Sequence, residues 1–409
     1  MMSKSVLLKD VPDGWDKKPL PSCVDKSSIP RDIKILQSEY LKSGKYPIID
    51  QGAEFVAGFT DDESKLYKGN LPVVVFGDHT RVLKYVDFQF SLGADGTKLL
   101  CPKSFLVPKY FYYYLLHVPL ESKGYNRHYK YLKEKEIIFP KKSEQGKVAF
   151  VLSEIHRAIE QQEQIIAKTK ELKRSLMHRL FTYGLRGEEL KETEIGLMPE
   201  NWEVFSISQK CLVKGSTAAL TELPLLDTKN TQHELVHGIK VSDMNTVGNE
   251  KSINRANIIA HLSKQDAIKK AVPRNSIVFP KRGAAISTNK KRLTTSWTVL
   301  DPNLIAIIPN EDIDAEYLYY WFLIFDLRSI QDPGPTPQLN KKDVNPIRFP
   351  CPSVEEQKQI SSFLSIIDSR HSLSEQKKNC FNELFKSMLQ LLMTGQVRVK
   401  DIDFGEDYE

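Results

Sequence analysis

The stretch Phe349-Pro350-Cys351-Pro352-Ser353-Val354-Glu355-Glu356-Gln357 introduces the longest regular pattern in this 409-residue chain. Apolar residues then recur at alternating spacings of three and four, which predicts a helix with one narrow apolar seam over residues 353–393. A glycine, Gly395, follows the last turn, where a left-handed cap favours that residue. The main apolar positions of the seam are Ile360, Leu364, Ile367, Phe381, Phe385, Met388 and Leu392.

The same arrangement occurs earlier in the chain. Phe139-Pro140 precedes Glu144-Gln145, a second seam predicts a helix over residues 143–181, and Gly184 follows. A helix of about 40 residues is about 60 Å long, and one narrow seam cannot bury itself. We therefore expect the two helices to pack against each other in antiparallel fashion. Two independent amphipathic helices are the alternative.

Other elements are duplicated in the same order. The turn-flanked Trp15 corresponds to Trp202, and apolar strand-like runs occur at 71–76 and 275–280. Aromatic runs follow at 110–116 and 317–323. The chain therefore contains an internal repeat of about 200 residues, which is too long for a solenoid unit.

This repeat predicts an α/β (α+β) fold with a pseudo-two-fold relation between its halves. Two globular blocks alternate with the two long helices of an antiparallel coiled coil. The expected boundaries are a first block at 1–142, the first helix at 143–183, a connector at 184–200, a second block at 201–352, the second helix at 353–394 and a C-terminal tail at 395–409.

The positive charge is concentrated on the two blocks. Residues 1–142 carry a net charge of +6 and residues 201–352 carry +4, whereas the rest of the chain is acidic. This distribution fits polyanion binding, although such excesses are also common on solvated surfaces. Five cysteines without CxxC spacing indicate reduced thiols in a cytoplasmic protein. The N-terminus lacks a signal-peptide pattern, and the apolar runs are too short to span a bilayer.

One stretch resembles a catalytic motif. His233-Glu234-Leu235-Val236-His237 has the H-E-x-x-H spacing of zinc peptidases, which requires a helix. The flanking residues are loop-like and strand-like, so we expect a coincidence. We find no dinucleotide, ATP or nucleophile-elbow motif, and expect no catalytic site, metal or cofactor in this chain. The aromatic runs could stack bases, but buried helix faces are favoured.

Polar loops near the strands and aromatic runs are better candidates for binding. Arg, Lys, Asn and Gln read base edges in the major groove, and surplus cations bind phosphates. Solvated charge runs are the alternative. The candidate DNA-binding residues are His79, Thr80, Arg81, Lys123, Tyr125, Asn126, Arg127, His128, Lys281, Arg282, Lys290, Lys291, Arg292, Thr336 and Gln338.

The order and duplication of these motifs resemble the specificity (HsdS-type) subunit of type I restriction-modification systems. The resemblance rests on the two Phe-Pro dipeptides, each followed by a Glu-Gln pair and a long helix. It also rests on Leu391-Leu392-Met393-Thr394-Gly395 and on Gly196-Leu197-Met198-Pro199-Glu200-Asn201-Trp202. It covers essentially the whole chain. The departures are Lys141-Lys142 after the first Phe-Pro and the interrupted Thr182-Tyr183-Gly184.

The resemblance implies that each block is a target recognition domain that reads one half of a split DNA sequence. The helices would space the blocks and dock DNA methyltransferase subunits, two in the expected complex, which bring S-adenosylmethionine and methylate adenine. Restriction subunits would add ATP- and Mg-dependent translocation and cleavage. This chain itself would be non-catalytic, cytoplasmic and free of membrane contact.

Two other functions remain open at this stage. The chain could be a coiled-coil scaffold that binds only proteins, with no preference among DNA duplexes. It could also be a zinc hydrolase that uses His233, Glu234 and His237. The target sequence, the spacer length and the stoichiometry of any complex do not follow from the sequence.

Overall fold

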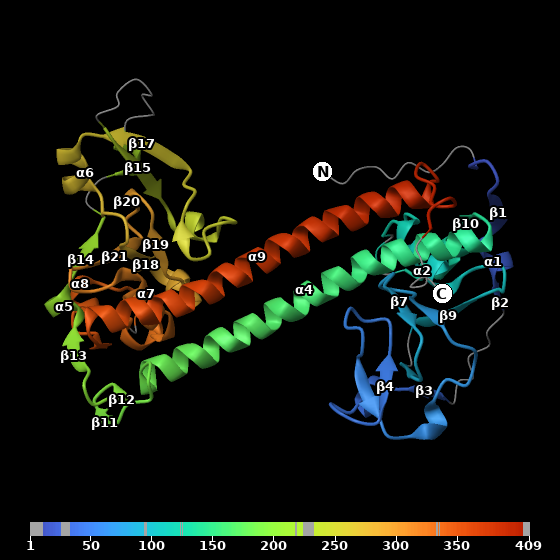
Figure 1. Cartoon of the computed structure of the whole chain (residues 1–409), viewed down its shortest axis with the longest axis horizontal. Coiled ribbons are helices and arrows are strands. Elements are labelled where there is room, and N and C mark those ends of the chain that lie inside the picture. Colours follow the sequence, from blue (N-terminus) through green and yellow to red (C-terminus); the bar gives the residue numbers. More distant parts are fainter. Residues whose placement is uncertain are drawn as a thin grey trace. The chain divides into compact units, whose positions relative to one another are not determined.

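The computed structural model describes residues 11–25, 33–93, 96–122, 124, 126–216, 219–223, 233–332, 334 and 336–403. The chain forms two compact units, which are described separately below. Unit 1 comprises Met1–Gln164 and Glu375–Glu409, and unit 2 comprises Ile165–Ser374 (Figure 1). Each unit therefore contains part of both long helices.

The elements of unit 1 follow one another in this order: β1 (Asp16–Pro19), α1 (Leu20–Cys23), β2 (Val24–Asp25), β3 (Lys34–Ile35), η2 (Gln37–Glu39), β4 (Tyr46–Ile49), β5 (Gly58–Thr60), η3 (Glu63–Lys65), β6 (Val73–Gly77), β7 (Leu83–Val86), β8 (Ser91–Gly93), β9 (Thr97–Pro102), α2 (Pro108–His117), α3 (Tyr129–Lys133), β10 (Glu136–Phe139) and α4 (Lys142–Tyr183), which continues into unit 2.

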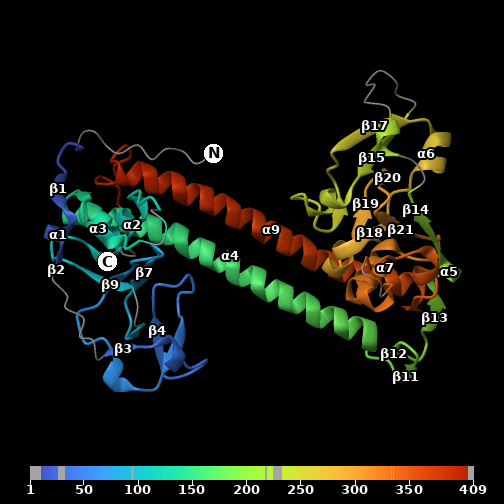
Figure 2. The same ribbon diagram turned by 180° about the vertical axis from the view of Figure 1, so that it is seen from behind.

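The central sheet of unit 1 is antiparallel, in the strand order β2-β9-β6-β7. Strand β6 is buried along its whole length, as its run of β-branched residues predicts. Helix α2 packs beside β7 and β9, and both views show it there (Figures 1 and 2). A second sheet has the order β3-β8-β4-β5, and β1 pairs with β10.

The elements of unit 2 are β11 (Leu190–Thr193), β12 (Gly196–Pro199), β13 (Glu203–Ser206), α5 (Ile207–Lys210), β14 (Cys211–Gly215), η4 (Leu220–Glu222), β15 (Glu234–Ile239), η5 (Val241–Asn245), β16 (Ser252–Ile253), β17 (Ile258–Leu262), α6 (Lys264–Lys270), β18 (Ile277–Pro280), η6 (Gly283–Thr288), β19 (Arg292–Thr294), β20 (Trp297–Leu300), β21 (Leu304–Pro309), α7 (Ala315–Ile324), η7 (Leu327–Ile330), α8 (Lys341–Val344), β22 (Arg348–Cys351) and α9 (Val354–Met393), which continues into unit 1.

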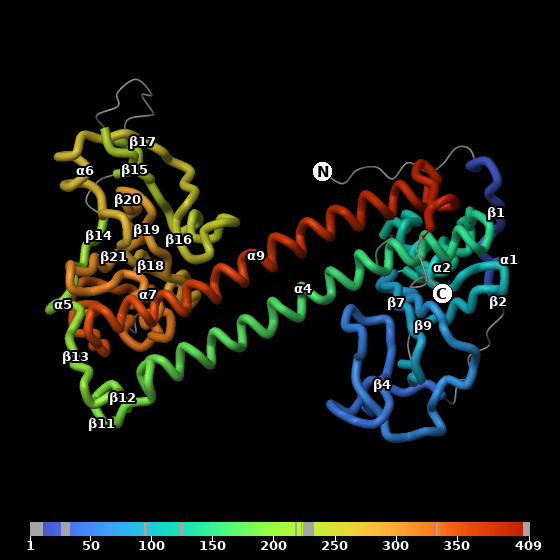
Figure 3. The backbone as a smooth tube through the Cα atoms, viewed as in Figure 1, coloured from blue at the N-terminus to red at the C-terminus, as the bar shows by residue number. Residues whose placement is uncertain are grey.

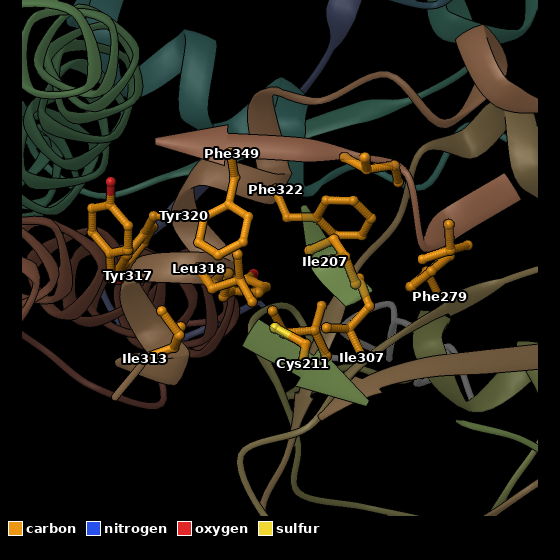
Figure 4. Close-up of a cluster of buried hydrophobic side chains, with 14 of the residues drawn as sticks. Ile207, Cys211, Phe279, Ile307, Ile313, Tyr317, Leu318, Tyr320, Phe322 and Phe349 are labelled. Atoms are coloured by element: carbon orange, nitrogen blue, oxygen red, sulfur yellow. The ribbon is translucent and has the colours of Figure 1, made fainter. Parts of the chain in front are cut away.

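The main sheet of unit 2 has the order β14-β21-β18-β19-β16, and a smaller sheet has the order β17-β15-β20. Side chains of β14, β18, β21, α7 and β22 meet in one buried cluster (Figure 4). The connector expected at 184–200 contains the hairpin β11–β12, whose Glu194 forms an ion pair with Arg348. The sequence analysis did not predict this hairpin.

The two units repeat one frame of strands and one helix. In unit 1, β6 pairs with β7 and β9, and β9 pairs with β2. In unit 2, β18 pairs with β19 and β21, and β21 pairs with β14. Helix α2 and helix α7 each follow the equivalent strand along the chain (Figure 3). The predicted duplication is therefore present at the level of sheet topology.

The two long helices run antiparallel to each other inside each unit. In unit 1, Val148 and Leu152 of α4 share a core with Leu392 of α9. In unit 2, Leu180 of α4 shares a core with Ile360 of α9. The predicted helices and their antiparallel pairing are thus confirmed. Within the described part of the chain, no helix has a stretch that is both long and apolar enough to cross a membrane.

The aromatic runs are core residues, as expected. Tyr110, Phe111, Tyr113 and Tyr114 on α2 are buried, and so are Tyr317, Leu318, Tyr319, Tyr320 and Phe322 on α7. The hydroxyl of Tyr110 donates to Ile138 O (2.9 Å), and the hydroxyl of Tyr317 donates to Pro350 O (2.8 Å). Each helix is therefore fixed to the Phe-Pro strand of its own unit.

Gln145 connects three segments of unit 1 at the start of α4. Its side chain is buried and accepts a hydrogen bond from Val107 N (2.8 Å), just before α2. It donates to Phe105 O (3.0 Å) and to Pro140 O (2.9 Å). One amide thus joins the long helix, the aromatic helix and the Phe-Pro strand.

Gln357 repeats this joint in unit 2. Its buried side chain accepts from Asp314 N (2.8 Å), just before α7, and donates to Pro352 O (3.0 Å). The Gln of each Glu-Gln pair is therefore a structural residue. A side-chain amide can satisfy backbone donors and acceptors of two other segments at once, which an apolar residue cannot do.

In each unit, a residue that follows one long helix bonds the glutamate at the start of the other long helix. Gly184 and Gly395 end α4 and α9 with positive φ (68° in both), as the cap prediction requires. In unit 1, Arg398 forms a bidentate pair with Glu144 (2.7 Å for both bonds) and lies over the ring of Trp15. In unit 2, the corresponding Glu356 instead accepts from Trp202 Nε1 (3.1 Å).

We predict that Gln357→Leu destabilises unit 2 by about 2 kcal/mol, because it leaves a buried donor and a buried acceptor without partners. Amide hydrogen exchange at the starts of α7 and α9 should accelerate, and the melting temperature should fall by several degrees. Gln359→Leu, at an exposed position of the same helix, is the matched control and should leave both measurements unchanged. Equal exchange rates in the two variants would contradict the assigned role of Gln357.

Candidate nucleic-acid interface

Two loops in each unit carry most of the predicted binding residues. The hairpin loop joins the equivalent strand pairs and comprises residues 78–82 in unit 1 and 281–291 in unit 2. The post-helix loop follows the aromatic helix and comprises residues 118–128 and 325–340. The repeated frame therefore presents the same two loops twice.

The two loops of unit 1 are held together by Asp78, at the end of β6. Its carbonyl accepts from His128 N (2.7 Å), and its carboxylate Oδ1 accepts from Tyr129 N (2.8 Å). The hydroxyl of Thr80 donates to Gln51 O (2.5 Å). The sequence analysis missed both Asp78 and Gln51, because a hydrogen bond to a distant backbone segment has no signature in a single sequence.

Six predicted residues of unit 1 are therefore neighbours in two connected loops. Thr80, Arg81, Asn126 and Arg127 are exposed, and His79 is half-buried. His128, in contrast, is fully buried and packs beneath the loop. The predicted residues Lys123 and Tyr125 lie outside the described residues.

The two loops of unit 2 are joined through backbone hydrogen bonds. Gly283 N donates to Pro337 O (2.8 Å), Leu339 N donates to Lys281 O (2.8 Å), and Arg282 forms an isolated bridge with Gln338. Arg282 and Thr336 are exposed beside this junction, and Lys281 and Gln338 are half-buried. Lys281, Arg282, Thr336 and Gln338 therefore lie close together at this junction.

The electrostatics of this junction favour an anion. Burial is the main cause that lowers the pKa of Lys281; the charge of Arg282 adds to it, and Asp301 opposes it. Two neighbouring cations that are partly removed from water gain from a bound negative charge. A phosphate at this junction would therefore raise the pKa of Lys281.

The remaining three predicted cations of unit 2 lie at the other end of η6. Lys290 donates to Asn245 Oδ1, and Arg292 donates to Met244 O (3.1 Å), so both contact η5. Arg292 is half-buried, and burial lowers its pKa. The five cations that are close in sequence therefore divide into two groups, because η6 separates them.

Lys291 is fully buried and cannot contact DNA without local opening of the structure. Burial lowers the pKa of its ammonium group to about 7. We therefore exclude Lys291 and His128 from the binding surface, although both were predicted to contact DNA. The sequence could not reveal this, because a cation that supports a loop has the same residue type as one that binds phosphate.

The H-E-x-x-H stretch is not a zinc site. Glu234–Ile239 forms strand β15, in which residues four apart lie about 13 Å from each other, too far to share one metal ion. The described part of the chain holds no cluster of three His, Cys, Asp or Glu side chains that could bind a metal. This structure removes the basis for the zinc-hydrolase alternative.

A groove of about 1050 Å³ lies between α4, the hairpin β11–β12 and α7 in unit 2. Its floor includes Met177 and Phe181, and its edge includes Leu197 and Ile324, which are 53% and 52% exposed. Four basic residues of α4 line it, Lys170, Lys173, Arg174 and His178, and Glu171 is the one acid among the described residues of the lining. Apolar side chains with a basic border are typical of a protein-binding surface.

We predict that His237→Leu makes the protein less sensitive to acid. Burial lowers the pKa of His237, so the unfolded chain binds a proton at a pH where the folded chain does not, and stability falls as the pH falls below about 6.5. Melting temperatures measured from pH 8 to pH 5 should therefore decrease less steeply in the variant. His233→Leu, which changes an exposed histidine, is the control. Identical pH profiles for His237→Leu and the wild type would contradict this assignment.

Comparisons with known proteins agree with this geometry. The family model described as "Type I restriction modification DNA specificity domain" matches residues 199–382. The specificity subunit of the type I restriction enzyme EcoR124I/EcoR124II of Escherichia coli is 22% identical over 391 residues, covering 90% of this chain and 91% of that protein. A putative MjaX specificity subunit of Methanocaldococcus jannaschii is 25% identical over 274 residues, and the alignment covers 66% of this chain and 61% of that protein.

A solved structure has the same fold. The S subunit of a type I restriction-modification system from M. genitalium superposes with a TM-score of 0.63 at 16% identity, covering 96% of this chain and 99% of that one. The sequence resemblance, the repeated frame, the paired helices and these matches lead to one conclusion. The chain is similar in sequence to the specificity (HsdS-type) subunits of type I restriction-modification systems, and it shares the fold of a solved S subunit.

Proposed function

We propose that unit 1 and unit 2 each read one half of a split DNA sequence through their hairpin and post-helix loops. The observation that supports this most strongly is the repetition of the same loop pair on the same frame. In each unit the loops place exposed cations beside exposed or half-exposed amide and hydroxyl side chains. Globular blocks 1–142 and 201–352 are accordingly proposed as target recognition domains.

The side chains in these loops suit two tasks. Asn126 and Gln338 carry amides that can bond base edges, and Thr336 can bond either a base or a phosphate. Arg127 and Arg282 are exposed and can bind phosphates or the edge of guanine. His79, Thr80, Lys281, Lys290 and Arg292 complete the proposed surface. Arg81, whose guanidinium bonds Leu120 O, lies at its edge.

The chemistry belongs to partner subunits in this proposal. DNA methyltransferase subunits, two in each complex, supply S-adenosylmethionine and methylate adenine, and restriction subunits use ATP and Mg for cleavage. We infer that a methyltransferase subunit docks in the groove of unit 2 with an amphipathic segment that has acidic borders. This inference rests on the exposed Leu197 and Ile324 beside the four basic residues of α4.

The decisive experiment is co-expression of this chain with its methyltransferase partner, followed by mapping of methylated adenine across the host DNA. The expected result is a split motif that disappears when this chain is deleted. A stable complex that produces no motif would instead favour a scaffold that binds only proteins. Such a scaffold also predicts little salt dependence in DNA binding, whereas phosphate contacts make affinity fall steeply with salt.

We predict that Arg282→Ala weakens DNA binding and lowers the slope of log affinity against log salt by about one, because it removes one phosphate contact. Fluorescence anisotropy with the methylated duplex at several salt concentrations measures this slope. Lys264→Ala, at an exposed position of α6, is the matched control. An unchanged slope with altered preference at one base pair would show that Arg282 reads a base instead.

We predict that removing one heptad from each long helix shortens the DNA spacer by about three base pairs, because seven residues correspond to about 10 Å of helix. The register of Lys173 with Asp368, and of His156 with Phe385, places residues 157–163 opposite 378–384. Deleting both segments together keeps the seam aligned. Methylation mapping should then give the same half-sites at a new separation; altered half-sites would contradict the spacer role.

We predict that Leu197→Glu reduces co-purification of the methyltransferase partner by about tenfold or more, because it places an acid in an apolar groove whose partner segment is itself acidic at its borders. Leu172→Glu is the control, because Leu172 is an equally exposed leucine on α4 (55%) outside the groove lining. Equal loss of partner in both variants would mean that the groove has no specific role.

A further inference from the structure

In unit 1, one cation connects the hairpin loop to the start of the post-helix loop. Arg81 Nη1 donates to Leu120 O (2.7 Å), three residues after the end of α2. Arg81 also has a positive φ (65°), which is unfavourable for any residue with a Cβ atom. Such a backbone conformation persists only where the surrounding contacts hold it.

In unit 2, Lys291 makes the equivalent connection from a buried position. Its Nζ donates to Phe325 O (2.6 Å), the first residue after α7, and to Asn289 Oδ1 (2.7 Å). The ammonium group lies 4.9 Å from the centre of the Phe322 ring. Asn289 itself has a positive φ (51°), and its Oδ1 also accepts from Leu327 N (3.0 Å).

The two cations are topological equivalents. Arg81 lies two residues before β7, and Lys291 lies directly before β19, the strands that pair with β6 and β18. Both donate to a carbonyl just beyond the C-terminal end of an aromatic helix. The helix dipole favours a positive charge near that end. In both units, although the loops differ, a cation therefore connects the hairpin loop to the start of the post-helix loop.

We propose that Arg81 and Lys291 are positioning residues for DNA recognition, each setting the post-helix loop of its own unit against the hairpin loop. The proposal rests on the proposed function of these loops. The side chains that would read bases, Asn126 in unit 1 and Gln338 in unit 2, lie further along the post-helix loops. Backbone hydrogen bonds attach the end of each post-helix loop to the hairpin loop, and the cation attaches its start, so the two attachments together set the position of these side chains.

Lys291 separates this role from direct contact with DNA. It is 0% exposed, so it cannot bind a phosphate, and its three ammonium donors point at a carbonyl, an amide oxygen and a ring face. Among the described residues, removing the cation leaves Phe325 O with the Asn289 amide as its remaining side-chain partner (3.2 Å). The start of the loop then loses the Lys291 attachment while the exposed cations of the surface stay in place.

The test uses Lys291→Met and Arg81→Met in the full chain co-expressed with its methyltransferase partner. Methionine retains an unbranched apolar stem, somewhat shorter than that of either cation, and removes the donor. Methylated-motif mapping gives base preference at each half-site separately, so each unit is an internal control for the other. We expect Lys291→Met to reduce base discrimination about tenfold at one half-site, and Arg81→Met to do so at the other half-site only.

Hydrogen exchange on the purified wild-type and variant chains supplies a second measurement that does not depend on methylation. Amides of residues 327–332 should exchange about tenfold faster in Lys291→Met, whereas amides of residues 118–122 should do so only in Arg81→Met. Arg81→Lys, which retains a donor, should restore most of the discrimination. Lys264→Met controls for loss of a lysine elsewhere in unit 2, and melting temperatures exclude general unfolding.

The outcomes separate the two proposals. A wild-type split motif with half-site-specific defects in the variants supports the positioning role. A wild-type split motif that neither variant changes overturns the positioning role and leaves the proposed function intact. Defects at both half-sites in each variant also overturn it, because they indicate a general loss of stability. A wild type without any split motif overturns both proposals.

Discussion

The buried amide at the start of each long helix is the constraint on which the rest of each unit depends. From the long helix, Gln145 and Gln357 each bond the residue just before the aromatic helix and the proline-containing segment that follows the last strand. The aromatic helix in turn covers the central sheet, whose strand ends carry the hairpin loop. A small change at this joint therefore shifts the frame that carries both loops of that unit.

The two units share this frame but differ in how their loops are built. Unit 1 uses a short hairpin loop organised by the Asp78 carboxylate, whereas unit 2 inserts η6 and joins its loops through backbone hydrogen bonds. The glutamates at the starts of the two long helices also have different partners. Glu144 binds Arg398, whereas Glu356 binds Trp202 and has a pKa raised mainly by burial. Under the proposed function, a common frame with different loops would allow the two units to read different half-sites.

Sequence patterns predicted the parts of the molecule that depend on periodicity. The long helices begin and end within about two residues of the expected bounds, because seam spacing and the capping glycines are local signals. The aromatic runs were correctly placed in the core. The candidate site was less predictable, since Lys291 and Arg292 are adjacent in sequence yet one is fully buried. Burial depends on what α7 and η7 bring over the loop, and residue type does not encode this.

The C-terminal residues of α9 belong to the first unit, and this has a consequence for synthesis of the chain. Leu392, Met393 and Val399 are part of the core of unit 1, whereas unit 2 is one continuous segment, Ile165–Ser374. A chain emerging from the ribosome can therefore complete the second unit first. The core of unit 1 stays incomplete until the end of α9 has been synthesised, which reverses the usual N-to-C order of domain folding.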